Sequence, residues 1–315
     1  MARQFWWAKV FYEVCMSLIS LMGALEIGLI FALVALGVLI SFRLLNFPDL
    51  TADGSFPLGG AVAAVMIVSG YNPWLACGLA AIAGAGAGCL TAWLHVRLGI
   101  LQLLASILVM IALYSINLRI MGAPNLALIG LPSVFTPFIS QIEDNSWLIQ
   151  PLLLLVIVVL VKLALDAFLT SEVGLALRAT GANPRMARAQ GIATSRLTVI
   201  GMALSNALIA LAGALYVQTQ GGADISMGIG TIVVGLAAVI IGETLLPARS
   251  LYLITLATLL GALLYRLMIA LALNADFIGL QAQDLNLITA VLVTLALILP
   301  KLKQKLKSKQ GKQPS

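Results

Sequence analysis

Residues 172–196 read EVGLALRATGANPRMARAQGIATSR, and they separate the apolar stretches WLIQPLLLLVIVVLVKLALDAF (147–168) and LTVIGMALSNALIALAGALYVQT (197–219). A helix needs about 20 apolar residues to cross the hydrocarbon core of a bilayer, and both flanking stretches reach this length. The insert between them is polar and carries Arg178, Arg185, Arg188 and Arg196. The sequence therefore predicts two membrane-spanning helices joined by a basic segment at the membrane surface.

The composition extends this interpretation to the whole chain. Hydrophobic residues make up 61% of the 315 residues, charged residues only 10%, and the mean hydropathy is +1.07. These values exclude an ordinary soluble domain. We expect an all-α polytopic membrane protein with about 8–10 transmembrane helices. Nine spans are predicted, near residues 15–42, 56–71, 73–96, 98–121, 147–168, 197–219, 229–246, 250–273 and 285–300.

Three parts of the chain follow from these spans. Residues 1–14 are expected to form an N-terminal interfacial segment, residues 15–300 a single transmembrane domain, and residues 301–315 a basic cytoplasmic tail. Basic residues collect on the cytoplasmic side of membrane proteins, so the tail and the 172–196 segment are both expected there. The net charge of +6 therefore reflects sidedness and attraction to anionic lipid, and no nucleic-acid partner is expected.

Two arguments disagree about the side of the membrane on which the N-terminus lies. Counting spans back from the tail places it outside, which Arg3 and Lys9 do not favour. Either the stretch around Trp6 and Trp7 lies flat in the membrane interface, or one span in the first half is miscounted.

A short internal repeat indicates where helices are broken. Residues 52–59 (ADGSFPLG) and 223–230 (ADISMGIG) share the pattern Ala-Asp-x-Ser-x-x-x-Gly, and each is expected to open an apolar helix. Broken helices at equivalent points of two repeat-related halves are typical of membrane transport sites. Two roles remain open for the repeated polar residues, capping of the helices alone or capping together with lining of the transport path or its gate; these residues are Asp53, Ser55, Asp224 and Ser226.

The 172–196 segment itself predicts a pair of short helices. The first is expected over 172–180, with Gly181 ending it, and the second begins with Asn183 as its cap and Pro184 in its first position. Small residues such as Gly174 would let a partner protein approach closely, while the arginines supply polar contacts. The alternative is a basic loop that only determines topology.

Two stretches of the chain resemble a known family. The run Glu172, Gly174, Leu177, Arg178, Ala179, Gly181, Asn183, Pro184, Ala187, Gly191 and Ile192 resembles the cytoplasmic coupling segment of ABC-importer permeases of the branched-chain amino acid and ribose type. Residues 46–56, NFPDLTADGSF, resemble the subgroup of amino-acid permeases that includes tryptophan and tyrosine carriers. The resemblance implies that a separate ATPase is contacted by Glu172, Gly174, Arg178, Gly181, Asn183, Pro184, Arg185, Arg188 and Gly191.

The resemblance also implies the rest of the transport system. The chain is then a permease and not an enzyme, with no cofactor of its own, because ATP and magnesium are bound by the partner ATPase. Further expected partners are an extracytoplasmic substrate-binding protein, a second permease copy and membrane lipid, in the cytoplasmic (inner) membrane of a bacterium. Transport is expected to proceed by alternating access of a cavity between the two copies.

Ionisable residues inside the spans are further candidates for function, because charge is costly in a membrane. Glu26 and Arg266 are predicted to form a buried ion pair or to line the transport path. Lys162 and Asp166 are spaced i, i+4, which favours an ion pair on one helix. Arg119 is expected to reach the outer interface with its long side chain.

The sequence gives little support for a metal site or for ATP binding by this chain. The isolated His95 and the three cysteines, Cys15, Cys77 and Cys89, lack the spacing of a metal site. No GxxxxGK[ST] motif is present to bind ATP. The glycines at 84, 86 and 88 are expected to allow close packing of helices.

Three classes of function remain, and the coupling segment favours the first. This is an ABC-importer permease for an amino acid or, alternatively, for a sugar or nucleoside, built as a homodimer or a heterodimer. The second is an ion-coupled secondary transporter, in which Glu26, Asp53 and Asp224 would be the coupling carboxylates. The third is a membrane scaffold without transport activity.

Overall fold

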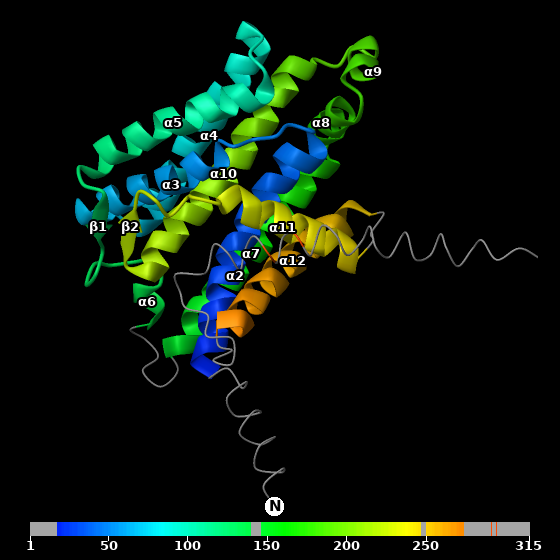
Figure 1. Cartoon of the computed structure of the whole chain (residues 1–315). Helices are drawn as coiled ribbons and strands as arrows, with labels where there is room; N and C mark the ends of the chain where they lie inside the picture. The colour runs from blue at the N-terminus through cyan, green and yellow to red at the C-terminus, as the bar shows by residue number, and fades with distance from the viewer. Residues whose placement is uncertain (1–17, 140–145, 247–249, 274–290, 292–293, 295–315) are drawn as a thin grey trace, which may run out of the picture.

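The computed structural model describes residues 18–139, 146–246 and 250–273, together with residues 291 and 294. Helices make up nearly all of this part, which confirms the all-α polytopic prediction (Figure 1). Two three-residue strands, β1 (Asn125–Ala127) and β2 (Gly222–Asp224), pair antiparallel. The helices are α2 (Leu18–Val38), the π-helical turn η1 (Leu39–Leu44), α3 (Ala52–Val68), α4 (Pro73–Leu98), α5 (Gln102–Met121), α6 (Thr136–Ile139), α7 (Ser146–Thr170), α8 (Glu172–Ala182), α9 (Pro184–Ala189), α10 (Thr194–Gln220), α11 (Thr231–Leu245) and α12 (Leu251–Leu273).

Each predicted span within the described residues is a helix. Six helices there are long and apolar enough to cross a membrane, and α3 and α11 are shorter apolar helices. The ninth predicted span, 285–300, lies outside the described residues except for residues 291 and 294, and the 1–14 segment and the 301–315 tail lie wholly outside them.

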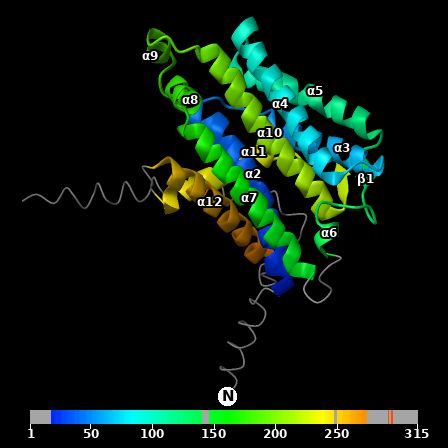
Figure 2. The same ribbon diagram turned by 180° about the vertical axis from the view of Figure 1, so that it is seen from behind.

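The helix α2 lies at the centre of the bundle. In its membrane-crossing window 72% of the residues are buried, against 28% for α5 and for α7. Both views show α7, α10, α11 and α12 around it (Figures 1 and 2). The outer faces of α5 and α7 expose Leu and Ile side chains, which is the surface expected to meet lipid.

Close helix contacts depend on small residues, as predicted for the glycines of α4. A Cβ on Gly84 would lie 2.4 Å from the Asn206 carbonyl oxygen of α10, and one on Gly88 would lie 2.1 Å from that of Met202. Gly86 faces open space instead. Two of the three glycines therefore let the α4 and α10 backbones touch.

Two breaks interrupt the pattern of long helices. The first follows η1, where Asn46 takes the left-handed φ of 53° and Pro48 comes two residues later, so the chain leaves the helix before α3 begins. The second follows α10, where Gly221 and Gly230 have φ values of 69° and 83°. Between these glycines lie β2 and a series of turns, and α11 begins only at Thr231.

The two ends of the bundle are distinct. The helices α8 and α9 lie at one end, and β1, β2 and α6 lie toward the other (Figures 1 and 2). The end of α2 and η1 reaches the α8 end, because Gly181 of α8 packs on the Leu44 carbonyl. The beginning of α2 therefore lies at the opposite end, which agrees with the parity argument from the sequence.

Candidate functional site

The α8–α9 pair has the two-helix form that the sequence predicts. The side-chain oxygen of Asn183 accepts hydrogen bonds from the backbone N–H groups of Arg185 at 3.2 Å and Met186 at 3.1 Å. Pro184 occupies the first position of α9, where a missing N–H costs nothing. Asn183 is thus the N-cap of α9, and the two helices meet at a fixed turn.

The predicted role of Gly181 is wrong. Helix α8 continues through Ala182, so this glycine does not end it. A Cβ at Gly181 would lie 1.7 Å from the Leu44 carbonyl oxygen, and one at Gly174 would lie 2.3 Å from the Phe168 carbonyl oxygen. Both glycines allow contacts inside the chain, so neither offers its missing side chain to a partner.

The outer face of the pair combines charge with apolar side chains. Glu172, Arg185, Arg188 and Gly191 are exposed, and Arg178 is half-buried. The sequence argument missed the exposed apolar residues of the same face, Val173, Leu175 and Met186. The sequence could have indicated them through helical spacing, because they lie on a different side of the two helices from the buried Gly174, Leu177 and Ala187. An exposed mixed surface of this kind is typical of a protein interface.

The carboxylate of Asp53 caps a different helix from the one that the repeat predicts. Asp53 lies in the first turn of α3, but its Oδ1 accepts from the Ile232 N–H at 2.8 Å and its Oδ2 from the Gly230 N–H at 3.3 Å. These amides belong to the beginning of α11, whose free N–H groups and partial positive charge favour a carboxylate. Asp53 therefore joins the starts of two helices.

The second repeat copy does not open a helix, contrary to the prediction. Asp224 ends β2, and its Oδ1 accepts hydrogen bonds from the backbone N–H and the hydroxyl group of Ser226. The pairing of β2 with β1 and the left-handed glycines hold this stretch extended and turned. The two motifs nevertheless meet, because Gly228 packs on the Asp53 carbonyl oxygen.

Ser55 belongs to a buried polar network in the middle of the bundle. Its hydroxyl donates to Asn206 Oδ1 at 2.7 Å, and Asn206 Nδ2 donates to Asp49 Oδ2 at 2.7 Å. The other oxygen of Asp49 accepts from the Thr51 N–H at 2.9 Å. Ser55 thus braces the first break against α10, and its predicted role at the transport path stays a prediction. The sequence signal that could have found Asn206 is an amide side chain near the middle of an apolar span.

The predicted pair between Glu26 and Arg266 is not formed. Among the described residues, the ion pairs within 4 Å are Lys162 with Asp166, as predicted, and Arg43 with Glu243. Glu26 and Arg266 are both half-buried, and Gly28 of α2 packs on the Cβ of Arg266. Lining of a path remains the open role for these two residues.

The Arg43–Glu243 pair was not found from the sequence. It joins the end of η1 to the end of α11 with Nε and Oε1 2.6 Å apart. The α11 helix thus runs from Asp53 in the bundle's middle to the end where α8 lies.

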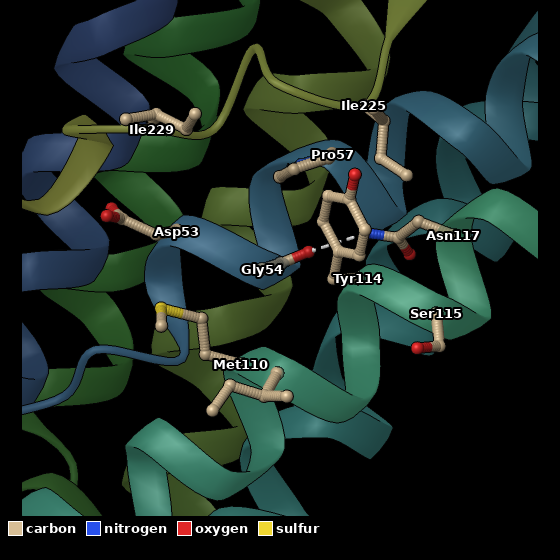
Figure 3. A pocket seen from close by; sticks show the side chains of 10 residues that line it. Asp53, Gly54, Pro57, Met110, Tyr114, Ser115, Asn117, Ile225 and Ile229 are labelled. Atoms are coloured by element: carbon tan, nitrogen blue, oxygen red, sulfur yellow. Dashed lines mark hydrogen bonds between the residues drawn. The ribbon is translucent and has the colours of Figure 1, made fainter. Parts of the chain in front are cut away.

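A cavity opens beside the meeting point of α3 and α11. Its volume is about 400 Å³, and its wall combines the beginning of α3, one face of α5 and the segment before α11 (Figure 3). Most of the wall is apolar, and the polar groups at it include Asp53, Tyr114, Ser115 and Asn117. Such a cavity suits a small organic molecule with few polar groups. Within the described residues, no group of three His, Cys, Asp or Glu could hold a metal ion.

A family model and one relative place the chain among transport permease components. The family model described as "Branched-chain amino acid transport system / permease component" matches residues 20–299. A tyrosine transport system permease protein of Clostridioides difficile (strain R20291) is 39% identical over 266 residues, which cover 84% of this chain and 86% of that protein. An uncharacterized protein of Rickettsia prowazekii (strain Madrid E) is 34% identical over 285 residues, covering 88% and 96% of the two chains. No solved structure gives a significant match.

Proposed function

The chain belongs to the family of branched-chain amino acid transport permease components. From this premise we propose that it is the permease subunit of an ABC importer for an amino acid, and that this amino acid is tyrosine. The family consists of transport components and not of enzymes. ATP is hydrolysed by a separate subunit, and this chain supplies the path through the bacterial inner membrane.

The observation that carries this proposal is the exposed α8–α9 pair and its contact with η1. The pair is capped at Ser171 and Asn183, so it behaves as one preformed surface. Its exposed Glu172, Arg185 and Arg188, together with the apolar Leu175 and Met186, provide the mixed contacts that a docking ATPase needs.

The contacts behind the pair give a route from this surface to the cavity. Movement of α8 would displace Leu44, because no space separates the Leu44 carbonyl from Gly181. The chain after Leu44 leads through Asp49, which is bonded to Asn206, to Asp53 at the start of α3. An ATP-driven shift of the docking surface would thus reach the junction of α3 and α11.

The substrate class is supported by the relatives and by the size of the cavity. The Clostridioides relative is described as a tyrosine permease, and a cavity of about 400 Å³ accommodates one amino acid. The polar groups of Asp53 and Asn117 at the cavity wall lie between helices that are long or apolar enough for a membrane protein, which argues for a water-filled or substrate-filled space, since such groups avoid lipid. The system would include an extracytoplasmic binding protein and a second copy of this chain.

Uptake by proteoliposomes tests the proposal. The chain is reconstituted with its co-purified ATPase and binding protein, and radiolabelled tyrosine uptake is measured with ATP inside, without ATP, and with a proton or sodium gradient alone. We expect uptake only with ATP and the ATPase. Gradient-driven uptake in the absence of any ATPase would establish an ion-coupled carrier instead.

A further inference from the structure

The α5 wall of the cavity contains a buried polar group with unused hydrogen-bonding capacity. Asn117 is 1% exposed, and its Nδ2 donates to the Gly54 carbonyl oxygen of α3 at 3.2 Å. Its Oδ1 is buried and accepts no hydrogen bond from any residue that the structure describes. If the side-chain amide were turned over, Asn117 Oδ1 would face the Gly54 carbonyl oxygen, and two acceptors would repel each other. The bond to Gly54 therefore shows that the group without a partner is the acceptor Oδ1.

A buried acceptor without a partner is costly, which points to a donor from outside the chain. Leaving such a group unpaired costs about 1–3 kcal/mol. Tyr114 lies one helical turn before Asn117 on the same cavity wall and is 56% exposed, and its ring lies beside the hydrogen bond from Asn117 to Gly54 (Figure 3). A donor that enters from the cavity would reach Oδ1 only after a local side-chain movement such as rotation of this ring.

The other residues of the cavity wall indicate which kind of chemical group carries that donor. Met110, Ile111, Ile225 and Ile229 provide an apolar surface, and Pro57 closes it on the α3 side. The carboxylate of Asp53 is already engaged by two backbone N–H groups and points away from Asn117 (Figure 3). A cationic group would therefore meet only neutral acceptors, at Asn117 and at the hydroxyl groups of Tyr114 and Ser115, in a mostly apolar wall, whereas a neutral O–H on an aromatic ring matches both the buried acceptor and the apolar surroundings.

We propose that this cavity binds the aromatic side chain of the substrate and that Asn117 Oδ1 accepts a hydrogen bond from its phenolic hydroxyl group. Asn117 is then a specificity residue that favours tyrosine over phenylalanine. This inference rests on the proposed function for its substrate, and it adds the group that distinguishes one aromatic amino acid from another.

The first test compares two substrates in the complete transport system. Initial uptake rates of tyrosine and phenylalanine are measured for the wild type, for Asn117→Leu and for Ser106→Ala, a buried polar position of α5 outside the cavity. We expect tyrosine uptake by Asn117→Leu to fall about five- to tenfold relative to phenylalanine, with no change of the ratio in Ser106→Ala. The binding protein is identical in all samples, so its own preference cancels.

Two results would overturn the proposal. An unchanged ratio of tyrosine to phenylalanine uptake in Asn117→Leu, including an equal loss of both, would show that the amide only holds α5 against α3 through Gly54. Cross-linking of Ser115→Cys to a second copy would show that this copy fills the cavity and would remove the specificity role. Neither result changes the dependence of wild-type uptake on ATP, so the proposed function is tested separately.

A second measurement needs neither uptake nor a folded Asn117 variant. In purified permease whose native cysteines are replaced by alanine, Ser115→Cys is labelled with N-ethylmaleimide in the presence of 4-methylphenol or toluene. We expect the phenol to slow labelling several-fold more than toluene, and Ile229→Trp, which fills the cavity, to abolish protection by both. Leu101→Trp, at an exposed position away from the cavity, is the matched control. Equal protection by the two probes would contradict the hydrogen bond to Asn117, even where the importer itself works.

Discussion

The carboxylate of Asp53 accepts a hydrogen bond from the backbone N–H of Ile232 at 2.8 Å, although 179 residues separate the two along the chain. The first turn of α3 thereby caps α11, and the two helices run from this point toward opposite ends of the bundle. A carboxylate from the first turn of α3 thus meets the positive beginning of α11. Whatever moves α11 relative to α3 must break or replace this contact.

Substitutions of Asp53 should rank by hydrogen bonding more than by charge. Asp53→Asn keeps an acceptor for the α11 amides, whereas Asp53→Leu leaves them unpaired and should cost about 1–2 kcal/mol more. We expect Asn to retain most ATP-driven uptake and Leu to lose most of it. Uptake and the melting temperature in detergent measure the difference. If Asn inactivated the protein as fully as Leu, the negative charge itself would be required, as in an ion-coupled carrier.

The contact between Gly181 and Leu44 should be essential for coupling. Gly181→Val places a side chain where the Leu44 carbonyl now lies, so α8 must move away from η1. We expect at least a tenfold loss of ATP-driven uptake with normal membrane insertion. Gly86→Val adds the same side chain at a glycine of α4 that faces open space, outside the docking surface, and serves as the control. Normal uptake by Gly181→Val would show that the signal takes another route.

The buried network around Asn206 should be sensitive to a change of a single atom. Asn206→Asp replaces the amide that donates to Asp49 by a second carboxylate, and repulsion between two buried carboxylates should destabilise the fold by about 3 kcal/mol or more. Ser205→Ala, one residue before it, removes a single hydrogen bond to the Gly37 carbonyl and should cost about 1 kcal/mol. Thermal unfolding in detergent compares the two variants. Equal melting temperatures would argue against a charged Asp49.

The two ends of the bundle should differ in their access from each side of the membrane. In a cysteine-free background, Met186→Cys on α9 should react with an impermeant thiol reagent only after the membrane is opened. Ile129→Cys, which is 87% exposed near the β1–β2 end, should react in intact cells. The reversed pattern would invert the topology and separate α8 and α9 from a cytoplasmic ATPase.

The sequence by itself determined the membrane class, the approximate positions of eight apolar helices, and the helix pair within 172–196. Each of these depends on local properties, namely the length of an apolar stretch, the capping ability of Asn183 and the restriction that Pro184 places on the backbone. Only the tertiary structure decided the roles of residues that act at a distance. Gly181 faces Leu44, Asp53 caps α11, and Asn117 is left with a free acceptor because α5 packs on Gly54. Hydrogen bonds and close contacts between distant segments depend on which backbones meet, and a single sequence does not encode that in its local pattern.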